Sequence, residues 1–127
     1  MSTEEQHAVA VIAALNAASA AAYDIDDLKT MTTLPNSYTE VTVSPRFGAP
    51  NRNPGSTGRT GWRITTRAVA KTVSNAREMR KRADVGLKYA RLTVAGDQST
   101  PIQPEGAEPI GGDDGWFSGL TTYTYAI

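Results

Sequence analysis

The sequence predicts an α+β fold, in which a mixed or antiparallel sheet of about four strands carries two helices on one face. Three observations support this. A chain of 127 residues can bury its own core as one domain. Two segments carry apolar residues at helical spacing, and others alternate polar and apolar residues. Strands with one polar face are typical of a sheet that is covered on one side. We therefore expect the order helix, two strands, helix, two strands, in a single domain over residues 1–127.

The first expected helix runs from Ser2 to about Ala22. Ser2 and Glu5 have the spacing of a capping box, which satisfies free N–H groups at a helix start. Glu4 and Glu5 stand where a signal peptide would need positive charge, so we interpret this segment as part of the mature protein, intracellular at synthesis. Its apolar stripe comprises Ala8, Val11, Ile12, Leu15, Ala18 and Ala22.

Two strands follow an acidic connector that covers residues 23–37. The first is Tyr38–Ser44, and the second is Trp62–Ala70, where Arg63 and Arg67 project from the face that cannot be core. Residues 45–61 hold three prolines, four glycines and three arginines, a composition that predicts a long mobile hairpin arm.

The second half of the chain predicts another helix and two more strands. The helix covers about Thr72–Ala90, with Val73, Ala76, Met79, Ala83, Leu87 and Ala90 as its apolar stripe. A short strand is expected over Ala90–Gly96, then a polar, proline-rich loop with a possible strand near Ile102. The last strand is Trp116–Ile127, whose aromatic residues alternate with threonines.

The net charge of zero conceals a segregation of charge along the chain. Residues 46–91 hold twelve basic and two acidic side chains, whereas residues 1–45 hold six acidic and one basic, and residues 92–127 hold five acidic and none basic. The oppositely charged regions could pair within one chain. Alternatively, they could meet between adjacent copies, where charge sets register and encounter rate more than affinity.

No group of residues predicts catalysis, a cofactor or a metal. There is no cysteine, and the one histidine, His7, lies in the first turn of a helix, where we interpret it as a surface residue. Asp24, Asp26 and Asp27 do not continue into the calcium-loop pattern, and Asp113 and Asp114 are interpreted as a turn. The sequence therefore favours a protein that is not an enzyme.

Three stretches resemble the tail terminator proteins of long-tailed phages that infect actinobacteria. They are "YTEVTVSPRFG", "GWRITTRAVAKTVSNAREMRKRA" and "STPIQPEGAEPIGGDDGWFSGLTTYTYAI". The most specific pieces are Gly61–Arg67 and Gly115–Thr122, and the resemblance extends from Asp24 to Ile127. It implies a lambda-type fold with two helices against a mixed sheet.

The resemblance also implies a function and partners. Proteins of this class form a ring, a hexamer, that caps the tail tube, ends tail elongation and presents a docking surface to the head-to-tail connector, or stopper. The chain would then be a virion protein at the head–tail junction, assembled in the host cytoplasm, with DNA passing unspecifically through the ring and no membrane contact. Another connector or a tail tube subunit is an alternative, as is a small nucleic-acid-binding domain that uses the basic helix.

A ring requires one surface patch to meet a different patch on the next copy. The residues that we expect at this subunit interface are Arg63, Arg67, Arg77, Arg80, Glu108, Asp113, Asp114 and Trp116. The arm is expected to contact the tube or the connector through Arg46, Phe47, Arg52 and Arg59.

Overall fold

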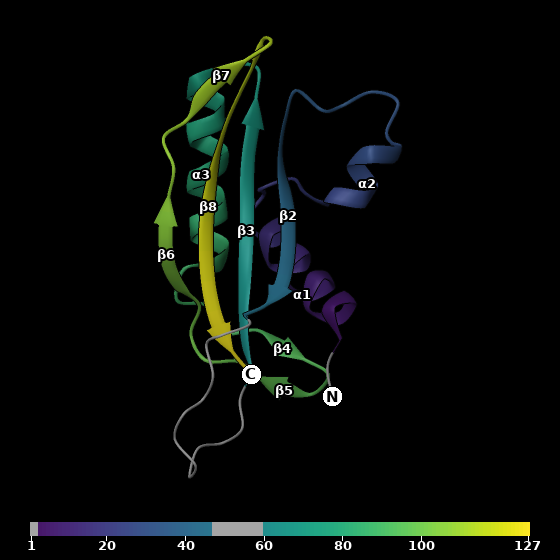
Figure 1. The fold of residues 1–127 in the computed structure, drawn as a ribbon, viewed down its shortest axis with the longest axis vertical. Helices are drawn as coiled ribbons and strands as arrows, with labels where there is room; N and C mark the ends of the chain where they lie inside the picture. Colours follow the sequence, from purple (N-terminus) through teal and green to yellow (C-terminus); the bar gives the residue numbers. More distant parts are fainter. Residues whose placement is uncertain (1–2, 47–59) are drawn as a thin grey trace.

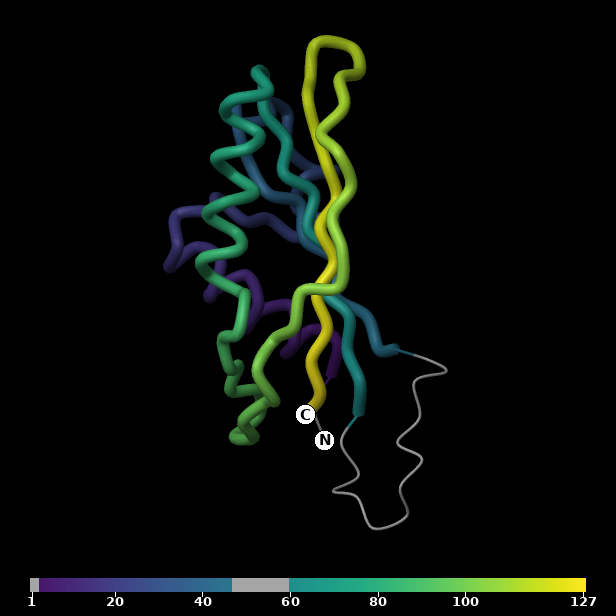
Figure 2. The backbone as a smooth tube through the Cα atoms, turned by 90° about the vertical axis from the view of Figure 1, so that its left-hand side faces the viewer, coloured from purple at the N-terminus to yellow at the C-terminus, as the bar shows by residue number. Residues whose placement is uncertain are grey.

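The computed structural model describes residues 3–46 and 60–127, which form a mixed sheet with helices on one face (Figure 1). Figure 2 shows the sheet from its side, with the helices on its left. The elements, in chain order, are α1 (Glu4–Ala17), β1 (Ala22–Asp24), α2 (Ile25–Thr30), β2 (Ser37–Pro45), β3 (Gly61–Ala70), α3 (Val73–Leu87), β4 (Thr93–Val94), β5 (Asp97–Gln98), β6 (Gln103–Ala107), β7 (Gly111–Asp113) and β8 (Trp116–Ala126).

The main sheet confirms the predicted α+β class and its mixed character. Its strand order is β1-β2-β3-β8-β6, and β7 also pairs with β8. The β1–β2 pair is parallel, and all other pairs of this sheet are antiparallel. The described residues form six strands in this sheet where about four were expected, and three helices where two were expected.

The first helix is shorter than its apolar pattern predicted. Its capping box uses Thr3 and Gln6, with each side chain bonded to the other residue's N–H, and not Ser2, which lies outside the described residues, and Glu5. The helix ends at Ala17 because Ser19 and Ala21 have positive φ angles of 61° and 47°. Ala22 therefore belongs to β1 and not to the helix stripe.

Helices α1 and α3 approach each other closely at Gly86. A Cβ atom there would lie 3.0 Å from both the Ala14 carbonyl oxygen and the Ala18 Cβ. The glycine that weakens α3 in propensity thus makes room for α1.

The alternation predicted for the long strands is confirmed. Val41, Ile64 and Tyr123 are buried on the face that meets α1 and α3, and Leu15 and Leu87 cover them from the helices. β8 lies between β3 and β6, so the C-terminal strand is central in the sheet.

His7 is buried, so its interpretation as a surface residue was wrong. Its side chain is 0% exposed, its ring stacks on Trp62 at 3.7 Å between centroids, and its Nδ1 lies 2.5 Å from the Tyr125 hydroxyl. Position 7 is one helical turn before the buried Val11, so it faces the core. Burial lowers the pKa of His7 and raises that of Tyr125.

Two further expectations were wrong. The strand expected over residues 90–96 is a two-residue strand, β4, in a separate hairpin with β5. Ala95 and Gly96 both have positive φ, which suits a tight hairpin turn and stops the strand. The connector over residues 23–37 contains α2, which begins after the N-cap Asp24 and buries Leu28.

Candidate functional site

The sheet face opposite α1 and α3 carries the predicted arginines among threonines. Thr42, Thr65 and Thr122 occupy one transverse row across β2, β3 and β8. Arg63 and Arg67 lie on the same face as Thr65, two residues before and after it on β3. Helices α1 and α3 do not pack on this face, but Leu28 of α2 is buried against Tyr38 and Val69 at one end of it.

Arg63 has a partner within its own chain. Its Nη2 lies 3.2 Å from Oε1 of Glu105, and the two side chains are 44% and 40% exposed. A surface ion pair of this kind contributes about 0–1 kcal/mol, so it restrains Arg63 only weakly.

A shallow depression brings together four of the residues predicted at the interface: Arg67, Asp113, Asp114 and Trp116. It has a volume of about 300 Å³. Arg67 donates a hydrogen bond to Ser118 Oγ at 3.3 Å, while the Lys71 ammonium lies 3.8 Å from the centroid of the Trp116 ring. The expected turn after β7 is confirmed, because Asp114 and Gly115 have the positive φ angles of a tight hairpin.

Tyr38 lines the same depression and packs edge-on against Trp116, with 6.1 Å between the ring centroids. Burial raises the pKa of Tyr38, and the charge of Glu40 raises it further, while Arg67 opposes the shift. The phenol is therefore neutral at physiological pH, and the depression combines aromatic surface with charges of both signs.

The remaining predicted residues lie apart from this depression. Arg80 donates hydrogen bonds to the carbonyl oxygens of Glu108, at 2.5 Å, and Leu120, at 3.5 Å, so it ties α3 to the ribbon at the end of the chain. Arg77 is exposed on α3. Arg46 donates its N–H to the Gly61 carbonyl, and the other predicted arm residues, Phe47, Arg52 and Arg59, lie outside the described residues.

Few side chains of the basic and acidic regions form ion pairs with each other within the described parts of the chain. These parts contain two ion pairs, Arg63–Glu105 and Arg82–Glu78. Only the first joins the basic middle to an acidic end.

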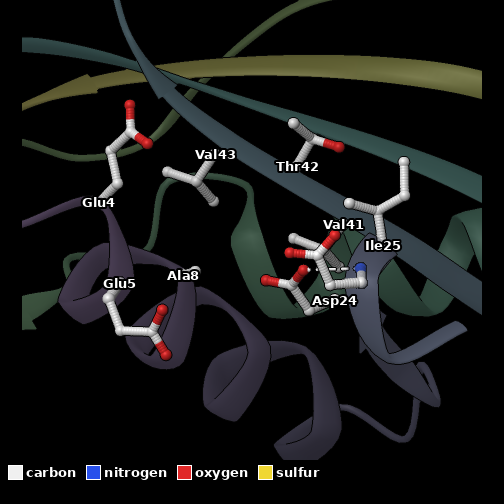
Figure 3. A pocket seen from close by; sticks show the side chains of 9 residues that line it. Glu4, Glu5, Ala8, Asp24, Ile25, Val41, Thr42 and Val43 are labelled. Atoms are coloured by element: carbon white, nitrogen blue, oxygen red, sulfur yellow. Dashed lines mark hydrogen bonds between the residues drawn. The ribbon is translucent and has the colours of Figure 1, made fainter. Parts of the chain in front are cut away.

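An acidic hollow between α1, α2 and β2 was not predicted (Figure 3). Glu4 and Glu5 come from α1, and Asp24 comes from the end of β1, where its carboxylate accepts the Asp26 N–H at 3.0 Å. The sequence signal was an aspartate N-cap followed by two acidic residues and a leucine, which marks a helix start. Because this stretch was interpreted as a connector without a helix, the hollow beside α2 was not predicted from the sequence.

The described residues contain no group of three or more histidine, cysteine, aspartate or glutamate side chains that could hold a metal ion. Among the same residues, no helix is both long and apolar enough to span a membrane.

Comparison with known proteins shows a shared fold but no matching family. No family model and no curated protein sequence matches the chain. Among solved structures, the chain is similar to one from the virion of a native gene transfer agent particle, with a TM-score of 0.62, 13% identity, and coverage of 98% of this chain and 90% of that one. It is also similar to a second solved structure, with a TM-score of 0.65, 12% identity, and coverage of 98% of this chain and 94% of that one. At these identities the chain shares the fold with both.

Proposed function

We propose that this chain is a structural virion protein whose copies form a ring that caps the tail tube. The observation that carries the proposal is the fold that it shares, over 98% of its length, with a chain of a gene transfer agent virion. The sequence resemblance to tail terminators adds the position, which is the end of the tube at the head–tail junction. The proposed ring is a hexamer, as in that class.

The charge distribution supports a ring built from identical copies. A ring needs heterologous contacts, and the basic and acidic stretches of this chain supply exposed groups of opposite sign that can meet between neighbouring copies. In the proposed interface, Arg63 and Arg67 of one copy, or alternatively Arg77 of its helix α3, meet the exposed turn of Asp113 and Asp114, with Trp116, of the next copy. Arg80 and Glu108 support this surface from within the chain.

The ring acts by docking and has no catalytic role in this proposal. Its partners are the tail tube below and the connector above, and DNA passes through its lumen. The segment between β2 and β3 is proposed to contact one of these partners, since its two ends are fixed by the bond from Arg46 to Gly61 and by the pairing of Thr60 with Ile127.

A tail tube subunit is the second candidate, because it is also a small virion protein that assembles with ring symmetry. The two functions differ in what happens after one ring has formed. A tube subunit stacks into cylinders of unlimited length, whereas a terminator stops growth.

The test is electron microscopy of the purified chain mixed with the tube subunits of its own particle. The proposal predicts tubes that carry one extra ring at an end and no longer elongate. Substituting both Arg63→Glu and Arg67→Glu is expected to reduce capping, while Arg91→Glu, an exposed site on neither patch, leaves it unchanged. Cylinders made of this chain, or capping that is insensitive to the double substitution, would count against the ring or its interface, respectively.

A further inference from the structure

Helix α3 presents a basic stripe that makes no ion pair within the described residues. Arg77 and Lys81 are exposed one helical turn apart, and Lys88 is the exposed C-cap residue directly after the helix. Val85, between Lys81 and Lys88, is 73% exposed. The two ion pairs of the described chain involve other arginines. The stripe lies on the side of α3 opposite Gly86, the residue that meets α1. It therefore faces away from the rest of the molecule.

The acidic hollow between α1, α2 and β2 lies on the other side of the helix pair, where acidic and apolar side chains line a groove. Two adjoining hollows of about 210 and 220 Å³ share Glu5, Ala8, Asp24 and Asp26. Figure 3 shows the first of them. The apolar lining is Ala8, Val9, Ile12, Ile25, Val41 and Val43, and the rim is Glu4, Glu5, Asp24, Asp26 and Asp27. Val9 is 60% exposed, so this groove, like the basic stripe, has an unburied valine among its charges.

The groove and the stripe point in opposite directions. Glu5, Ala8 and Ile12 line the groove on one side of α1, whereas Ala14 contacts α3 from roughly the opposite side. In Figure 1, α3 lies toward the β8 edge of the sheet and α2 lies beyond β2 at the other edge. One copy therefore cannot place its own stripe in its own groove, but a second copy can do so.

Neither edge strand of the sheet is well suited to pairing with a strand of another copy. β6 carries Pro104, which cannot donate to a neighbouring strand, and its register shifts between Pro104 and Gly106. At the other edge, β1 has only three residues. Joining copies by extending the sheet is thus disfavoured, which leaves contacts between side-chain surfaces.

We propose that the basic stripe of α3 in one copy docks into the acidic groove between α1 and α2 of the next copy. This inference rests on the proposed ring and names a contact that the predicted interface residues do not include, apart from Arg77. Val85 packs against Val9 at the centre, and the charged side chains set register around them. Each copy has one stripe and one groove, so the contact is heterologous and propagates around a ring.

Cysteine cross-linking tests the contact directly, because the chain has no cysteine of its own. The substitutions Val85→Cys and Val9→Cys, made in one chain, leave every charge in place. Under mild oxidation they are expected to give a ladder of covalent oligomers, whereas either substitution alone gives at most a dimer. Val85→Cys with Ala107→Cys is the matched control, since Ala107 is an exposed apolar residue that lines neither the groove nor the depression at Arg67. An equal ladder from this control pair, or none from the Val85–Val9 pair, overturns the inference.

Charge reversal in the same cysteine background tests the electrostatic part. Lys81→Glu alone and Asp27→Lys alone are each expected to slow cross-linking by more than about tenfold, because like charges then meet. The two reversals together are expected to restore it. No slowing, or no restoration, contradicts the pairing. If Lys81→Glu instead abolishes a salt-sensitive affinity for DNA and leaves cross-linking unchanged, the stripe is a nucleic-acid surface and the inference fails.

These results are separable from the tail function. A ladder without capping of tube ends would support the contact and refute the tail role. Capping without a ladder would support the tail role and refute this contact.

Discussion

Replacing Gly86 with alanine has two opposite effects on the free energy of unfolding. Helix propensity alone predicts that Gly86→Ala stabilises α3 by about 1 kcal/mol. The packing predicts the reverse, because the new methyl would lie 3.0 Å from the Ala14 carbonyl oxygen and from the Ala18 Cβ, and 3.5 Å from the Leu15 Cα. Two of these three atoms are backbone and cannot rotate away. Overpacking of this kind costs about 1–3 kcal/mol.

We expect the packing cost to win. The net loss in the free energy of unfolding is about 1 kcal/mol, which lowers the melting temperature by about 4 °C in a domain of this size. Thermal and denaturant unfolding followed by circular dichroism measure both quantities. Ser74→Ala, at an exposed position of the same helix, is the control and should change stability by less than about 0.5 kcal/mol. Adding Ala18→Gly should recover part of the loss. A Gly86→Ala protein that is more stable than the wild type would refute the close helix contact.

Two other predictions concern buried polar groups. Burial lowers the pKa of His7, so the unfolded chain binds more protons than the folded chain below about pH 6.5, and the melting temperature should fall as the pH drops from about 6.5 toward 5. The substitution His7→Gln should remove much of this dependence on pH. An unchanged dependence in the variant would contradict the role of His7. Tyr123 donates a hydrogen bond to the Asp84 carboxylate, so Tyr123→Phe should lower the free energy of unfolding, measured in urea, by about 1.5–3 kcal/mol. The loss should be clearly smaller in an Asp84→Asn background. Equal losses in both backgrounds would contradict the coupling between the two side chains.

The long elements could be predicted because their signals are local. In β3 the alternation of Trp62 and Ile64 with Arg63 follows from strand geometry alone, and the structure reproduces it. The apolar stripe of α3 likewise gives Ala76, Met79, Ala83 and Leu87 as buried residues. Such patterns depend on the nearest neighbours in sequence and on one buried face.

The missed features depend on contacts between distant parts of the chain. The spacing of His7 from Val11 and Leu15 places it on the buried face of α1, but its partners, Trp62 and Tyr125, come from two strands far along the sequence and are not given by that local pattern. The depression at Arg67 forms because β8 pairs with β3, which brings the turn at Asp113 and Asp114 beside the arginine. The acidic groove requires α2 to lie beside α1, and a six-residue helix gives only a weak periodic signal.

The most direct test of the account is an electron-microscopy reconstruction of the head–tail junction of the particle that carries this chain. The account predicts one closed ring of this chain between the last ring of tube subunits and the connector, with a surface of positive charge on each copy against a surface of negative charge on the next. A density in which this chain repeats along the tube, or in which adjacent copies touch only through surfaces of like charge, would contradict it.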